Sequence, residues 1–463
     1  GPLMSLGGGA PPASGPGAKA AAPPGRPSAS GGEGGAALPP RLAALLAHAQ
    51  DQLLRQSSDR VISRAVRLLR CLTPALAAGE PGGSSERALA LDPDLLRRLC
   101  AEGVPDEIPA LRAVAWKLLL GFLPCDVDDW DEVLGASRSA YAAFAAELGE
   151  WLQGSGDGEG AAMRRRGDGA SPEPGTPKQL LALIVKDVIR TRPELDFFAR
   201  RLCADGPEGS VDFRRAGREP AIDVLRPRCH NDVLARILLV YARLNPGLRY
   251  VQGMNEICAP IYYVFAQDPL DAAEAEADAF SCFSLLMAER RDCFIKSLDH
   301  TDDGMLGLTR QLMELLGRKD AQLGRHLEAN EVAPIFFAVR WLMLMLTQEL
   351  EMPDVLRVWD RLLSDDAPEA LPPFLHYLCV AIMLQMRAEL LASDFAGCTE
   401  LLQSGPPGGL AVDASMDLAK RLRAEDLAQP GSPAEPRSVG PWRGGRILRM
   451  LGRRGRSRAR ASP

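Results

Sequence analysis

One arginine stands at the end of a strongly apolar stretch, residues 180–190, whose only charged residues are Lys186, Asp187 and Arg190. Pro193 follows, and because a residue before a proline is pushed out of the α region, the helix is expected to end there. Arg190 then lies in the last turn and can reach outward. Asp187 lies about 60° away on the same helix face and is expected to hold the guanidinium. By itself this spacing is more typical of a structural salt bridge.

A glutamine occupies a short junction in the segment 245–254. Pro246 and Gly247 predict a turn, and Gly253 frees the backbone beside Gln252. A glutamine placed there, just before an apolar helix around residues 257–265, can point its amide at a neighbouring molecule. The spacing alone favours the simpler interpretation, a solvated side chain in a loop that connects two helices.

A third pattern combines arginine with tryptophan. Arg112 and Trp116 lie one helical turn apart and are expected to stack, guanidinium over indole. Two later segments predict further aromatic side chains held by ion pairs, and they contain Arg340, Trp341, Arg357, Trp359 and Asp360. We interpret all of these as structural residues.

The sequence lacks the signatures of most nucleotide, metal and nucleophile sites. It has no Gly-Lys dipeptide, which excludes a Walker A phosphate loop, and no Gly-x-Ser-x-Gly, His-Glu-x-x-His or kinase signature. Its ten cysteines form no Cys-x-x-Cys pair, and its five histidines show no zinc-ligand spacing. We therefore expect buried thiols in a reducing compartment, no metal site and no NTPase activity of the chain's own.

Taken in order along the chain, these patterns resemble the TBC domain family of Rab GTPase-activating proteins. The matching motifs are Arg112-x-x-x-Trp116, Ile184-x-x-Asp187-x-x-Arg190 and Tyr250-x-Gln252-Gly253-Met254, followed by Phe336–Trp341 and Pro353–Asp360. Each motif is weak alone, whereas several in one order at compatible spacing are specific. The resemblance covers residues 98–403.

The resemblance implies an all-α, two-lobed domain that receives a GTP-bound Rab GTPase and acts in vesicle trafficking. Arg190 matches the arginine finger and Gln252 the glutamine finger, and the motif residues Asp187, Tyr250, Ile184 and Gly253 support them. The chain then supplies catalytic residues in trans and needs no cofactor of its own, since the partner carries GTP and Mg²⁺. A non-catalytic Rab-binding scaffold or effector is the alternative.

Composition favours helices along most of the chain, because Leu, Ala, Met, Glu and Arg dominate the periodic segments. An amphipathic segment, 38–80, is expected either to pad the core or to form a separate hairpin. Low-complexity loop inserts are predicted near 153–177 and 204–221. Residues 1–37, which begin with the tag-like sequence Gly-Pro-Leu, and residues 404–463 are expected to be disordered extensions.

Charge is distributed unevenly along the chain. The net charge is −6, but residues 437–463 hold nine Arg and no Asp, Glu or Lys. This tail fits either weak contact with an anionic membrane or an ordinary disordered end, and nucleic-acid binding is the less favoured option. Because the longest apolar runs are shorter than the ~20 residues that span a bilayer, we expect a cytoplasmic protein, peripheral on endomembranes at most.

Overall fold

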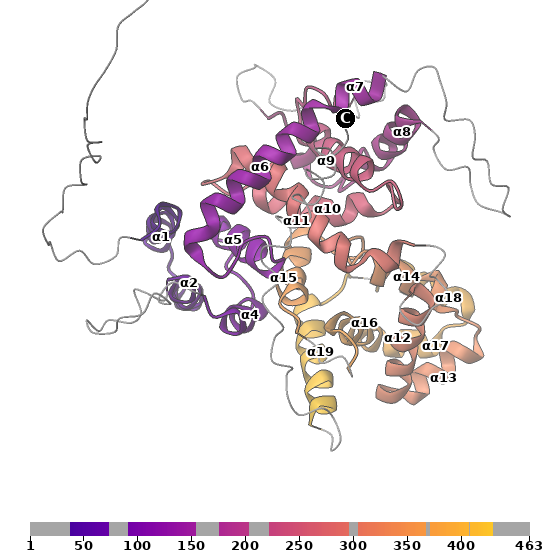
Figure 1. Ribbon diagram of the computed structural model, residues 1–463. Coiled ribbons are helices and arrows are strands. Elements are labelled where there is room, and N and C mark those ends of the chain that lie inside the picture. The colour runs from indigo at the N-terminus through magenta and orange to yellow at the C-terminus, as the bar shows by residue number, and fades with distance from the viewer. Residues whose placement is uncertain are drawn as a thin grey trace, which may run out of the picture. The chain divides into compact units, whose positions relative to one another are not determined.

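The computed structural model describes residues 38–73, 91–153, 176–202, 222–295, 304–366, 371–406 and 408–428 (Figure 1). The predicted leader 1–37, nearly all of the two loop inserts and the arginine-rich tail lie outside these residues. In the described residues the regular structure is helical, apart from isolated β-bridge residues such as the pair Arg201 and Cys229. The predicted all-α fold is confirmed.

The first group of helices runs from the N-terminal segment to the middle of the chain. Its members are α1 (Pro40–Leu53), α2 (Asp59–Leu72), α4 (Pro93–Ala101), α5 (Pro109–Leu119), α6 (Trp130–Ala146), α7 (Leu148–Gln153), α8 (Pro177–Val188), α9 (His230–Leu244), α10 (Met254–Ala266) and α11 (Ala275–Glu289). Helix α9 lies against α8, α10 and α11, and its apolar side chains are almost completely buried. Helices α8 and α10, which adjoin Arg190 and Gln252, are therefore mounted on one central helix.

The second group of helices follows in sequence. It comprises α12 (Met305–Lys319), α13 (Ala321–Ala329), α14 (Ala338–Met343), α15 (Met352–Leu363), α16 (Phe374–Gln385), α17 (Arg387–Ala392), α18 (Phe395–Ser404) and α19 (Val412–Leu427). Helix α12 packs on α13, α14 and α16, and α16 packs on α19. Helix α15 packs instead on α4, α5 and α10, so it joins the second group to the first.

Helix α19 corrects the prediction that the chain is disordered from residue 404 onward. Val412, Met416, Ala419 and Leu422 recur at helical spacing and are buried, and the helix lies against α16. The Lys319 ammonium fixes the helix end by donating to the Asp426 carboxylate over 2.7 Å. The Gly- and Pro-rich composition around this region suggested disorder, but the region contains a short amphipathic helix whose apolar face packs on α16.

The predicted amphipathic segment 38–80 carries α1 and α2, which pack on α5 and α4 respectively. Leu42 and Leu45 of α1 are fully buried. Arg41 also donates to the Asp271 carboxylate over 2.6 and 2.9 Å. Of the two expected arrangements, the described part of the segment, residues 38–73, pads the core.

The Asp360 carboxylate is the centre of a buried cluster that joins α15 to α5. It accepts from the Arg112 guanidinium over 3.0 and 3.1 Å, from Trp116 Nε1 over 2.8 Å and from the backbone N–H of Val104 over 2.8 Å. The Trp116 ring stacks on Trp359, with 5.7 Å between ring centroids. Arg112 and Trp116 thus share one carboxylate and do not form the stacked pair that their spacing predicts.

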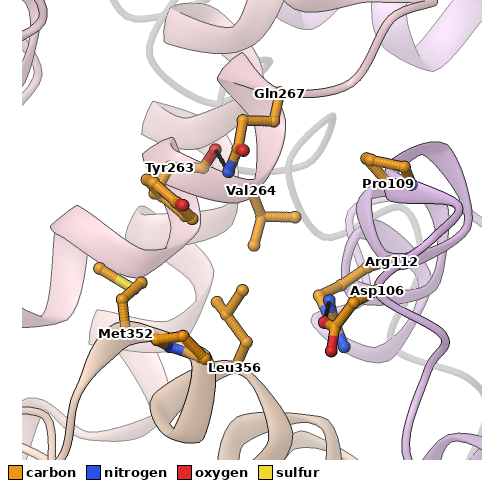
Figure 2. A pocket seen from close by; sticks show the side chains of 9 residues that line it. Asp106, Pro109, Arg112, Tyr263, Val264, Gln267, Met352 and Leu356 are labelled. Atoms are coloured by element: carbon orange, nitrogen blue, oxygen red, sulfur yellow. Dashed lines mark hydrogen bonds and ion pairs between the residues drawn. The ribbon is translucent and has the colours of Figure 1, made fainter. Parts of the chain in front are cut away.

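The outer end of this cluster faces a hollow of about 300 Å³ between α5, α10 and α15. Figure 2 shows the ion pair of Arg112 with Asp106 across from Tyr263 and Gln267. Burial lowers the pKa of Arg112, but the Asp360 and Asp106 carboxylates outweigh it and raise the pKa. Arg112 is therefore a permanently charged, fully paired group, and the hollow's described lining includes neither Arg190 nor Gln252.

The other arginine–tryptophan segments also form ion pairs beside buried rings. Arg340 donates to the Glu349 carboxylate over 2.5 and 2.9 Å and to the carbonyl of Gln403 over 2.8 Å, next to the buried Trp341. Arg357 pairs with Asp354 and Asp413 on the exposed side of α15, opposite the fully buried Trp359. These contacts hold α14 and α15 in place.

Candidate functional site

Arg190 lies in a turn directly after α8. Thr176 begins this helix with a capping box shared with Gln179. The helix ends at Val188, and the backbone N–H of Arg190 then donates to the carbonyl of Asp187 over 3.0 Å, which closes a turn. The Arg190 side chain is exposed, and among the described residues it makes no ion pair or hydrogen bond.

The three-residue spacing predicts that the Asp187 carboxylate holds the Arg190 guanidinium, but the structure shows no such contact. The carboxylate instead accepts a hydrogen bond from the Tyr250 hydroxyl over 2.8 Å, and this bond joins residues 63 positions apart. Burial and the neighbouring Asp187 charge raise the pKa of Tyr250, so the phenol stays protonated and remains a donor. Asp187 therefore ties the end of α8 to the segment that precedes Gln252.

Gln252 lies in the last turn before α10, and its side chain is exposed. Gly253, the N-cap residue, has a φ of 101°, a left-handed conformation that glycine adopts readily. A Cβ at this position would lie 2.7 Å from Leu344 Cδ2 on the segment after α14. The sequence correctly identified a glycine-dependent junction, but the close approach of Leu344 adds a second requirement that it did not reveal.

Asn255, in the first turn of α10, connects the segment that carries Arg190 to the segment that carries Gln252. Its Oδ1 accepts from the backbone N–H of Gly253 over 3.2 Å and lies 3.0 Å from the Tyr250 hydroxyl. Its Nδ2 donates to Thr191 Oγ1 over 2.9 Å. Thr191 is the residue after Arg190, so the two backbone segments belong to one hydrogen-bonded network.

Arg192 anchors the same network to the second group of helices. Its buried guanidinium donates to the carbonyls of Thr347 and, over 2.7 Å, Leu350. It also lies 3.9 Å from the Glu256 carboxylate. Burial raises the pKa of Glu256, and the Arg192 charge opposes that shift. The Arg192 guanidinium thus connects the segment after α14 to the C-terminal end of α8 and to the first turn of α10.

Ile184 completes the predicted set. It is fully buried on α8 and turns the opposite face of that helix into the core. The residues that sequence reasoning missed are Thr191, Arg192 and Glu256, along with the bridging contacts of Asn255. The available signal was a run of polar residues beside otherwise apolar helix ends.

Among the described residues, no group of three or more His, Cys, Asp or Glu side chains is placed to hold a metal ion. Within the same part of the chain, no helix combines the length and the apolar character needed to cross a membrane.

The chain resembles known proteins in sequence. Residues 220–391 match the Rab-GTPase-TBC domain family model. TBC1 domain family member 13 of Homo sapiens is 35% identical over 373 residues, covering 69% of this chain and 91% of that protein. The GTPase-activating protein gyp1 of Schizosaccharomyces pombe is 26% identical and covers 79% of the chain and 61% of its own length.

The fold has a counterpart among solved structures. The crystal structure of the Ypt/Rab-GAP domain of Gyp1p superposes with a TM-score of 0.57 at 21% sequence identity. The match covers 79% of this chain and 98% of that one. At this level of identity the likeness concerns the fold.

Proposed function

Since the chain belongs to the Rab-GTPase-TBC domain family, we propose that it is a GTPase-activating protein that accelerates GTP hydrolysis on a GTP-bound Rab GTPase. The observation that carries the proposal is the pairing of two exposed side chains, Arg190 and Gln252, on backbone segments that one buried network holds together. An activator needs such groups on its surface, because they must enter another protein's active site.

Each of the two side chains has a distinct part in the reaction. Hydrolysis on a small GTPase is slow because the charge developing on the β- and γ-phosphate oxygens and the attacking water are poorly stabilised. The Arg190 guanidinium supplies positive charge and a planar fork of donors to those oxygens. The Gln252 amide orients the water. Nucleotide and magnesium remain with the partner, so the chain needs no phosphate-binding loop.

The dual-finger mechanism makes a specific claim about the origin of the water-positioning glutamine. In other pairs of GTPase and activator, the GTPase itself supplies the glutamine that positions this water. If Gln252 acts in trans, a Rab whose switch glutamine is changed to leucine should lose intrinsic hydrolysis yet still respond to this protein. A non-catalytic scaffold would bind the same Rab and leave its hydrolysis unchanged.

The test is single-turnover phosphate release from a panel of GTP-loaded Rab proteins. Wild-type chain and Gln252→Ala are each combined with the wild-type Rab and with its glutamine-to-leucine form. We expect Gln252→Ala to lose at least ~10²-fold on both substrates, the scale of removing one positioned transition-state donor. Gln50→Ala, at an exposed glutamine of α1, is the matched control and should retain full activity.

The outcomes separate the alternatives. Activity that follows the Rab glutamine and ignores Gln252 would leave only an arginine-finger mechanism. Binding without acceleration across the panel would establish the scaffold instead.

A further inference from the structure

We propose that Thr191 and Asn255 form a positioning bridge that fixes the Arg190 and Gln252 segments relative to each other, so that the two side chains enter the partner's site as one unit. This inference rests on the proposed activator function. Neither bridge residue reaches the substrate, since Thr191 is 3% and Asn255 5% exposed. Their effect must therefore pass through the backbone that carries the two exposed side chains.

Both ends of the Asn255 amide form hydrogen bonds. Its oxygen accepts from the Gly253 N–H over 3.2 Å, and its nitrogen donates to Thr191 Oγ1 and, over 3.3 Å, to Glu256 Oε1. A backbone N–H can only donate, so the atom opposite Gly253 must be the amide oxygen. This fixes the orientation of the amide and leaves its nitrogen aimed at Thr191.

Thr191 passes the connection on to α8. Its hydroxyl donates to the carbonyl of Asp187 over 3.0 Å and accepts from Asn255 Nδ2. The backbone N–H of Arg190 donates to that same carbonyl. A continuous path of three hydrogen bonds therefore runs from the Arg190 turn through Thr191 and Asn255 to Gly253, beside Gln252.

The Tyr250–Asp187 bond is a second, parallel link between the same segments. It joins two side chains, whereas the bridge through Thr191 and Asn255 ends on the backbone at Asp187 and at Gly253. Backbone position decides where an exposed side chain begins. The bridge thus constrains the starting points of both side chains, which by themselves make no hydrogen bond among the described residues.

The consequence for catalysis follows from geometry. A misplacement of about 1 Å in a transition-state contact can cost ~10²-fold in rate. Loss of the bridge should thus lower the maximal rate at saturating activator and leave the activator concentration at half-maximal rate nearly unchanged. A residue that merely stabilised the fold would lower the amount of active protein and the melting temperature instead.

The experiment uses the full chain with Thr191→Val, which keeps the side-chain shape and removes the hydroxyl, and Thr191→Ser, which keeps the hydroxyl. Thr309→Val is the matched control, because Thr309 is equally buried and donates to the carbonyl of Leu306 over 2.9 Å in α12. Single-turnover hydrolysis by a responsive Rab is measured together with hydrogen exchange of residues 250–256.

We expect Thr191→Val to lower the maximal rate about 10- to 100-fold with half-saturation within about twofold. Amide exchange at residues 250–256 should become faster, above all at Gly253. Thr191→Ser should restore both properties, and Thr309→Val should change neither.

Two results would overturn the inference. A Thr191→Val variant with a wild-type maximal rate, or with unchanged exchange at 250–256, refutes the bridge and leaves the activator function standing. A wild-type chain that accelerates no Rab in the panel refutes the function itself. The two failures are thus distinguishable.

Discussion

Gly253→Ala tests whether the glycine next to Gln252 is required by both backbone and packing. An alanine at a φ of 101° pays ~1–2 kcal/mol for left-handed backbone. Its methyl group would also lie 2.7 Å from Leu344 Cδ2, and Leu344 is buried. Overpacking of this kind costs typically ~1–3 kcal/mol. We therefore expect a loss of about 2–5 kcal/mol in the free energy of unfolding.

The assay combines urea unfolding with single-turnover hydrolysis. Gly135→Ala is the control, since Gly135 lies within α6 with open space around its Cα. An alanine there should stabilise the protein by ~0.5–1 kcal/mol, the opposite sign. Gly253→Ala should additionally lose maximal rate, because relief of the Leu344 contact displaces Gln252. Wild-type stability and rate in Gly253→Ala would refute the reasoning.

Three other predictions address separate parts of the chain. Arg190→Ala should reduce stimulated hydrolysis on the order of 10³-fold with near-normal Rab binding, and Arg190→Lys should recover little of it in the same single-turnover assay. Trp116→Ala should cost roughly 3–5 kcal/mol by urea unfolding, whereas unchanged stability would contradict its place beside Trp359. Removal of residues 437–463 should weaken sedimentation with anionic liposomes at low salt and leave hydrolysis in solution unchanged.

A fifth prediction concerns acid sensitivity. Burial lowers the pKa of His376 from its ordinary 6.5 to about 4, so the unfolded chain takes up the proton first. The stability that the neutral side chain contributes is present above pH 6.5. It is lost as pH falls toward 4, by up to about 3 kcal/mol. In urea titrations at several pH values, His376→Gln should make the free energy of unfolding less dependent on pH between 6.5 and 4. An unchanged pH dependence would show that His376 is not the source of the acid sensitivity.

The sequence was a good guide to the site residues' local surroundings. A helix that ends near Arg190 and a glycine junction beside Gln252 were both predictable, because each depends on neighbours in sequence. The prediction kept Arg190 in the last helical turn, whereas the helix ends at Val188. The partner of Asp187 was not predictable. A three-residue spacing suggests Arg190, whereas the observed donor, Tyr250, is 63 positions away. Tertiary contacts of this kind leave no periodic signal.

The fold shows the same division between local and distant information. Helical periodicity predicted an all-α chain, but the composition around α19 suggested disorder. The apolar face of α19 is buried because it packs on α16, a contact that the local sequence does not report. Likewise, Arg112 and Trp116 were recognised as structural residues, but the carboxylate that they share belongs to Asp360, more than 240 residues later. Which side chain completes a buried pair is decided by the fold.

Backbone strain adds a further argument about the region around Arg190 and Gln252. Five non-glycine residues have positive φ among the described residues, and four of them are Arg192, Arg249, Met345 and Leu346. Arg192 and Arg249 lie close in sequence to Arg190 and Gln252, and the other two precede the carbonyls that Arg192 binds. Each such conformation costs of order 1–3 kcal/mol and persists only where surrounding contacts enforce it. The buried hydrogen bonds from the Arg192 side chain to the Thr347 and Leu350 carbonyls supply part of that enforcement, so they help to stabilise an otherwise unfavourable backbone beside Arg190.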